Sequence, residues 1–216
     1  MTFNDYVAEI RPTINELLED NRLTCDKCND LILDVYTKGS EVINIIRNRT
    51  EIDKTNLEEK IGDFIRLIVQ LSMELGCVNF DAIALGSLQK EGKINIVRGQ
   101  KVSLFEYQEK VKVLGEEYLL SFKSDGATEV LFGLVAKIGE LLGNHGRDIL
   151  MGVGLTESEI IIKIGEILRS LTLIASAYDL DLEKIIRSNI KKTKSRYNND
   201  GIAKLPGMDK EDGDGR

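Results

Sequence analysis

The chain has 216 residues, of which 42% are hydrophobic and 30% charged, an ordinary composition for a globular protein with a sizeable core. Acidic residues outnumber basic ones by 36 to 29, so a net charge of −7 gives no general electrostatic drive to bind nucleic acid or an anionic membrane surface. No apolar run of about 18 residues and no signal-peptide core occurs, so we expect a cytoplasmic protein without a membrane segment.

The first half predicts four helices, at residues 3–19, 24–47, 55–75 and 80–89, because apolar residues recur there at helical spacing. Thr55 followed by Glu58 is the pattern of a capping box at the start of the third helix. Cys25 and Cys28 fit half of a zinc site, a redox pair or one face of a helix. The last interpretation is favoured because Cys77 and His145 are the only other cysteine and histidine in the chain.

The segment at residues 88–102 connects the two halves. Ile94, Ile96 and Val102 alternate with polar residues, as in a β-strand, but the glycines of this segment favour a connecting loop. We therefore predict that the chain has only helices as regular structure.

The second half predicts four more helices, at residues 103–122, 126–142, 156–179 and 181–197. Ser103 with Glu106 forms one capping-box pattern, residues 156–159 form another, and Asp181 caps the last helix. Glycines between residues 143 and 154 predict a mobile connection, which makes His145 a loop residue rather than a catalytic base. The polar, highly charged residues 198–216 predict a disordered tail.

One four-residue motif occurs four times: a lysine, two residues that include a glycine, and an acid. It begins at Lys38, Lys60, Lys137 and Lys163. The first copy matches the third at an offset of 99 positions, the second matches the fourth at 103, and residues 2–6 match residues 103–107 at 101. This order predicts two homologous repeats, residues 1–97 and 98–197, with the seam near residues 92–100.

Residues three apart share one face of a helix, so two facing helices that carry the motif would bring two lysines and two acids together. A single such pair is an ordinary surface ion pair worth about 0.3 kcal/mol. Four copies, placed alike in both halves and each with a glycine, favour an inherited site instead.

The second half resembles the MazG-type all-α nucleoside triphosphate pyrophosphohydrolases, a superfamily that includes the dimeric dUTPases. Residues 104–110 are similar to the first helix of that family, 136–142 to the Glu-Glu-x-Gly-Glu-Leu segment of its second, and 162–168 to the Glu-Glu-Leu-Gly-Asp segment of its third. Asn189, Lys192 and Arg196 match the Asn-x-x-Lys…Arg pattern of its fourth helix. The first half resembles the family more weakly, since Ser87 stands in place of the asparagine.

This resemblance implies an all-α fold in which two tandem four-helix repeats form a pseudo-twofold bundle. Family members assemble their core from two subunits, whereas a tandem chain can form that pair within itself. A further homodimer through outer faces is compatible with the sequence, although no single motif indicates it.

The resemblance also implies that paired acids hold Mg²⁺, which would activate the water that releases pyrophosphate. Carried over position by position, the retained ligands are Glu41, Asp63, Glu140 and Glu166, and the replaced ones are Lys38, Lys60, Lys137 and Lys163. A protonated lysine cannot ligate Mg²⁺ and brings a positive charge where the family has a negative one. Glu59 and Glu159 leave a shifted metal site open.

Ammonium groups also bind phosphate directly. The leading hypothesis is therefore a MazG-like protein that binds nucleotide phosphates and whose Mg²⁺-dependent hydrolysis is lost or altered. Its candidate phosphate-binding residues are Lys38, Lys60, Lys137, Lys163, Asn189, Lys192 and Arg196. The alternatives are an active Mg²⁺-dependent pyrophosphohydrolase that removes unwanted nucleotides, and a purely structural layer of lysine–acid pairs. The sequence leaves the question of enzyme activity open and does not identify the base.

Overall fold

The computed structural model describes residues 1–18, 25–47, 52–76, 79–89, 100–122, 127–151 and 157–196. Within these ranges the regular structure is helical, and the only β-type contact is an isolated antiparallel bridge between Thr2 and Ser103. The prediction of an all-α chain is therefore confirmed for the described residues. None of the described helices combines the length and the apolar character needed to span a membrane.

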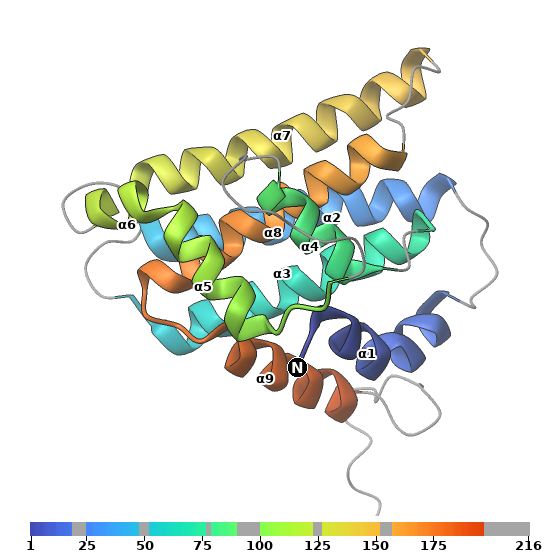
Figure 1. Cartoon of the computed structure of the whole chain (residues 1–216). Coiled ribbons are helices and arrows are strands. Elements are labelled where there is room, and N and C mark those ends of the chain that lie inside the picture. The colour runs from blue at the N-terminus through green and yellow to red at the C-terminus, as the bar shows by residue number, and fades with distance from the viewer. Residues whose placement is uncertain are drawn as a thin grey trace, which may run out of the picture.

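Nine helices occur in the described ranges. They are α1 (Phe3–Leu18), α2 (Cys25–Arg47), α3 (Lys54–Glu74), α4 (Phe80–Gln89), α5 (Leu104–Leu114), α6 (Glu116–Phe122), α7 (Ala127–Met151), α8 (Glu157–Ala177) and α9 (Leu182–Arg196). Helices α3 and α8 lie side by side in the middle of the bundle, with α2 packed on α3, α7 packed on α8, and α2 and α7 packed on each other (Figure 1). Short helices then cover the remaining faces of this central pair.

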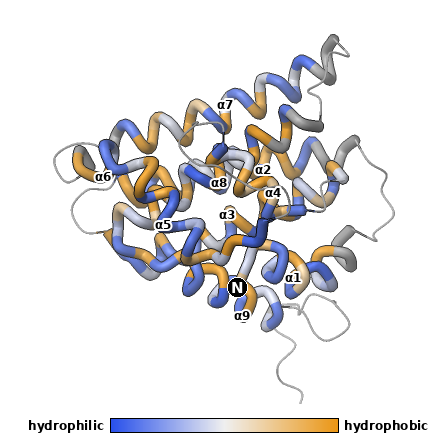
Figure 2. Tube along the Cα trace, viewed as in Figure 1, coloured by the Kyte–Doolittle hydropathy of each residue, from blue (hydrophilic) through white to orange (hydrophobic). Residues whose placement is uncertain are grey.

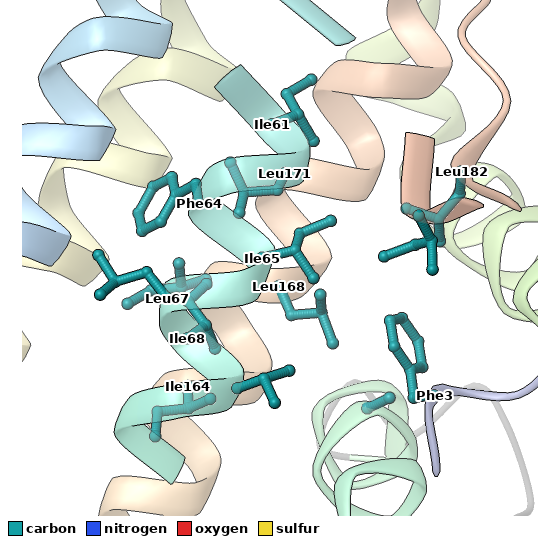
Figure 3. Packing of buried hydrophobic residues seen from close by; sticks show 14 of the residues in the cluster. Phe3, Ile61, Phe64, Ile65, Leu67, Ile68, Ile164, Leu168, Leu171 and Leu182 are labelled. Carbon is teal, nitrogen blue, oxygen red and sulfur yellow. The ribbon is translucent and has the colours of Figure 1, made fainter. Parts of the chain in front are cut away.

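The last helix of each half packs against the penultimate helix of the other half. Helix α4 lies on α8, and α9 lies on α3. Buried apolar residues of both halves therefore form one continuous core, in which Ile61, Ile65 and Ile68 of α3 lie near Leu168 and Leu171 of α8 (Figure 3). Apolar segments recur along each of the long helices, as this arrangement requires (Figure 2).

The starts of α1 and α5 meet at the Thr2–Ser103 bridge, where Leu104 N donates to Met1 O at 2.8 Å. Both helix starts have the same local hydrogen bonds. The amide of Asp5 donates to Thr2 Oγ1 at 3.1 Å, and that of Glu106 donates to Ser103 Oγ at 3.2 Å. The capping box predicted at Ser103 is confirmed. Positions about 101 apart in the chain thus make equivalent contacts.

The glycines of the motifs in α3 and α8 lie where another helix crosses. A Cβ added at Gly62 would lie 3.2 Å from Asn189 Cβ of α9. One added at Gly165 would lie only 2.6 Å from Ile83 O and 2.9 Å from Ser87 Cβ of α4. These two glycines permit the close crossing of α9 over α3 and of α4 over α8.

Helix α7 runs to Met151, so the prediction that it ends at residue 142 was wrong. Gly143 and Gly146 lie within the helix, and His145 is a helical residue whose Nε2 lies 2.5 Å from Asn29 Oδ1 of α2. A glycine in a helix costs about 1 kcal/mol relative to alanine. Packing of α7 against α2 and α8 outweighs that cost. A prediction from the glycines alone cannot include these contacts with other helices.

Two other helix boundaries differ from the prediction. The third helix is capped by Asp53, whose Oδ1 accepts from Thr55 N at 3.0 Å and Asn56 N at 3.1 Å, so Thr55 is not its cap. The helix predicted at residues 103–122 divides at Gly115 into α5 and α6. The cap at Asp181 is confirmed by a 3.0 Å bond from the amide of Lys184.

Several predictions lie outside the described residues. They are the seam and repeat boundary within residues 90–99, the capping pattern that begins at residue 156, Cys77, the side chains of Cys25 and Cys28, and the tail from residue 198.

Asp81 of α4 is a buried carboxylate whose removal should stabilise the fold. Its Oδ1 accepts from Asn4 N at 3.1 Å, whereas its Oδ2 has no hydrogen-bond partner among the described residues. Burial raises the pKa of Asp81 despite its hydrogen bonds with the backbone of α1. When folding raises the pKa of an acid, the folded state becomes less stable as the pH rises from the unfolded to the folded pKa and the buried carboxyl ionises.

We therefore expect Asp81→Asn to increase the free energy of unfolding by about 1 kcal/mol at neutral pH, because Oδ1 is kept and the buried charge is removed. The gain should shrink on acidification, as Asp81 of the wild type becomes protonated. Urea unfolding at neutral and acidic pH measures both effects. A gain that grows on acidification would contradict this assignment.

Candidate functional site

The four motifs gather into two clusters. The α2–α3 cluster consists of Lys38, Glu41, Lys60 and Asp63. Lys38 Nζ lies 2.8 Å from Glu41 Oε1 within α2, and Lys60 Nζ of α3 lies 2.9 Å from Glu41 Oε2. Glu41 therefore lies between two ammonium groups, as expected when two facing helices each place a lysine and an acid three residues apart.

The ionisation of this cluster follows from its pairs. Burial acts to raise the pKa of Glu41, but hydrogen bonds from Lys38 and Lys60 outweigh it, so that pKa is lowered. The hydrogen bond to Glu41 raises the pKa of Lys60. Both shifts favour the charged forms, so the pairs stabilise the fold at neutral pH and weaken when Glu41 is protonated in acid.

Asp63 is held by the last helix of the other half. Its Oδ1 accepts from Asn189 Nδ2 at 3.1 Å, and its Oδ2 lies 2.6 Å from Lys192 Nζ. Tyr6 Oη in turn donates to Asn189 Oδ1 at 2.8 Å. Lys192 also lies 2.5 Å from Glu59 Oε1. Helix α9 thus supplies both an amide and an ammonium group to the acids of α3.

The α7–α8 cluster consists of Lys137, Glu140, Lys163 and Glu166. Lys137 Nζ of α7 lies 3.2 Å from Glu166 Oε2 of α8. Lys163 of α8 donates to Glu140 of α7 and lies 4.0 Å from Glu166 Oε2. The hydrogen bond from Lys163 lowers the pKa of Glu140. Glu166 is only 4% exposed, and the ammonium groups of both lysines lie near its carboxylate.

The two clusters differ at the crossing helix. Asn189 lies against Gly62 and bonds Asp63, whereas Ser87 lies against Gly165 and donates to Ala84 O of its own helix at 2.7 Å. The asparagine contact of the α2–α3 cluster therefore has no counterpart from Ser87.

The residues present do not fit the Mg²⁺ that the family resemblance implies. Among the described residues, no three His, Cys, Asp or Glu side chains lie together as metal ligands. Each acid of the motifs lies beside a lysine that supplies the positive charge. Glu59, one candidate for a shifted site, is paired with Lys192, and Glu159 is an exposed residue of α8 that also has an interaction.

A cavity of about 290 Å³ lies beside the α7–α8 cluster, between α5, α6, α7 and α8. Its lining combines apolar side chains with three charged ones, the bases Lys137 and Arg169 and the acid Glu129. The lining residues are Val111, Leu114, Gly115, Tyr118, Glu129, Val130, Gly133, Lys137, Arg169, Ser170 and Leu173. Lys137 therefore belongs both to the ion-pair cluster and to the cavity wall.

Of the predicted phosphate-binding residues, Lys137 is the one that lines this cavity. Lys38, Lys60, Asn189 and Lys192 lie in or beside the α2–α3 cluster, and Lys163 pairs with Glu140. Arg196 ends α9, and its side chain is outside the described residues. The sequence prediction missed Arg169 and Tyr118 as cavity residues. Arg169 lies 103 positions after Arg66, the same offset as between Lys60 and Lys163, and this match is the signal that could have indicated Arg169.

No protein-family model, curated protein or solved structure matches this chain. The function of the site therefore has to be inferred from its own residues and their geometry.

Proposed function

We propose that the chain is a tandem MazG-like helical protein that binds a phosphate-bearing small molecule of the nucleotide class without a metal ion. The ligand would occupy the cavity between α5, α6, α7 and α8, with its phosphates on Lys137 and Arg169. The single observation that carries this proposal is the presence of Lys137 and Arg169 together on the wall of a cavity in which Glu129 is the only acid of the lining.

The chemistry of the cavity suits an amphiphilic anion. An ammonium group has three N–H donors, and the contact with Glu166 occupies only one direction around Lys137. A guanidinium group binds phosphate in a bidentate manner, so Arg169 would add geometric selectivity. Val111, Val130 and Leu173 offer an apolar surface for a planar base or another apolar moiety.

Binding without hydrolysis follows from the same ion pairs. In the resembled family the acids act through bound Mg²⁺, whereas here each acid of the motifs already contacts an ammonium group. The equivalent contacts at offsets near 101 support the tandem arrangement. A structural role remains the better proposal for the α2–α3 cluster, because Glu41 and Asp63 are each held by partners from other helices.

Lys137 and Lys38 provide a matched pair of variants for testing the proposal. They occupy the same position of the motif, each contacts a glutamate, and each has a side chain that is 28% exposed. Lys137→Gln should weaken binding of a nucleoside triphosphate at least about tenfold, because it removes a charge-assisted contact. Lys38→Gln also removes a lysine–glutamate pair. It should nevertheless leave the affinity unchanged, because Lys38 belongs to the α2–α3 cluster and does not line the cavity.

Isothermal titration calorimetry with pyrophosphate and a panel of nucleoside triphosphates in EDTA is the measurement, and circular dichroism confirms that both variants are folded. Equal effects of the two variants would contradict the cavity as the binding site. Failure of the wild type to bind any member of the panel would overturn the proposed function.

A further inference from the structure

Helix α7 is apolar on both of its long sides. Its inner side packs on α2 and α8, with Leu134, Ile138 and Leu141 buried. On its outer side Phe132 is 68% exposed and Val135 is 45% exposed. Helix α7 lies along one edge of the bundle, with no other described helix beyond it (Figure 1). Large apolar side chains that are exposed together on the outer side of a helix are typical of a surface that another molecule covers.

The same outer side continues in small residues. We define the outer face of α7 as Phe132, Val135, Ala136, Gly139, Gly143 and Gly146, which recur at spacings of three and four and so share one face. A Cβ at Gly139, Gly143 or Gly146 would meet nothing within 4 Å. No contact among the residues that the structure describes therefore explains these glycines, although each costs about 1 kcal/mol of helix stability relative to alanine.

We propose that this face binds the same face of a second copy of the chain, with the two α7 helices antiparallel about a twofold axis beside Gly139. Each residue then faces the one equally far on the other side of Gly139. Phe132 lies seven positions before Gly139 and meets Gly146, seven positions after it. Val135 lies four positions before and meets Gly143, four positions after. The bulky side chains of one copy thus lie over the bare positions of the other.

The charges at the edge of the face agree with this arrangement. Glu129, which also lines the cavity, and Arg147 are both exposed and lie 18 residues apart, or five turns of about 3.6 residues, so they occupy the same edge of α7. A twofold axis brings the same edge of both helices together. Glu129 of each copy then lies about two positions, or roughly 3 Å along the axis, from Arg147 of the other. The symmetry forms this pair twice.

Charge complementarity and shape thus favour a second copy over an unrelated helix. An unrelated partner would explain the exposed Phe132 and Val135, but it would not require an acid ten positions before Gly139 and a base eight positions after it on the same edge. Glu140 lies 11 residues, or about three turns, from Glu129 and so on the same edge, but its pairing with Lys163 of α8 offsets its charge near the twofold axis.

Sedimentation velocity of the full chain over a range of concentrations tests the proposal. We expect a monomer–dimer equilibrium for the wild type. Glu129→Arg and Arg147→Glu should each weaken the dimer at least about tenfold, because each places like charges together twice. The double reversal Glu129→Arg/Arg147→Glu should restore the dimer, since it exchanges the signs of each pair.

Gly143→Leu gives an independent steric test, since it fills the space that Val135 of the second copy would occupy. It should abolish the dimer while circular dichroism shows an unchanged helix content. A wild type that stays monomeric at all concentrations would overturn the proposal. So would single reversals without effect, or a double reversal that fails to restore association.

Discussion

Gly165→Ala is expected to lower the free energy of unfolding by about 1–3 kcal/mol, the usual cost of overpacking a well-packed core. The added Cβ would lie 2.6 Å from Ile83 O, and a backbone oxygen cannot move aside as the end of a flexible side chain can. Helix α4 would have to separate from α8, which would disturb the core shared by the two halves. Urea unfolding followed by circular dichroism measures the change.

Gly86→Ala is the matched control for this prediction. Gly86 lies on α4, the helix that Gly165 contacts, yet a Cβ at Gly86 would meet nothing within 4 Å. Only helix propensity then acts, so this variant should gain about 0.5–1 kcal/mol. Opposite signs for two identical substitutions would show that helix crossing, rather than propensity, requires glycine in the motif. A stabilising Gly165→Ala would disprove the close crossing.

Lys137→Met should lower the free energy of unfolding by about 1–3 kcal/mol at neutral pH. It leaves the Glu166 carboxylate, which is only 4% exposed, with the ammonium group of Lys163 at the longer distance of 4.0 Å. Loss of one partner of a fully buried pair costs about 3–5 kcal/mol, and the value is reduced here because the Lys137 side chain is 28% exposed.

The double variant Lys137→Met/Glu166→Met should recover most of this loss, since replacing both partners of such a pair with apolar side chains is often neutral or stabilising. A double-mutant cycle by urea unfolding gives the coupling energy of Lys137 and Glu166 directly. If the losses of the two single variants simply add, the two side chains do not depend on each other. The ion-pair interpretation of the α7–α8 cluster would then be wrong.

Local patterns predicted the starts of α5 and α9 and the shared faces of the motif-bearing helices. The capping box at Ser103 and the cap at Asp181 depend on residues a few positions apart, and both occur as expected. The meeting of lysines and acids also follows from local spacing, because a spacing of three places them on one helix face. The pairs Lys60–Glu41 and Lys137–Glu166 then needed only that the motif-bearing helices face each other.

Features that depend on distant packing were not predicted. Glycines suggested that α7 ends before His145, whereas contacts with α2 and α8 keep it helical to Met151. The crossing of α9 onto α3, which places Asn189 beside Asp63, also depends on the arrangement of whole helices. The cavity beside Lys137 was missed for the same reason, because its lining comes from four helices.

The affinity of the wild type for a nucleoside triphosphate, measured by calorimetry in EDTA and again in excess Mg²⁺, tests the central claim most directly. That claim is that lysines have taken over the charge of the metal in the motifs. We predict binding in EDTA that is as tight as in Mg²⁺ or tighter, because Mg²⁺ would compete with Lys137 and Arg169 for the phosphates. Binding only in the presence of Mg²⁺, or release of pyrophosphate on its addition, would contradict the account.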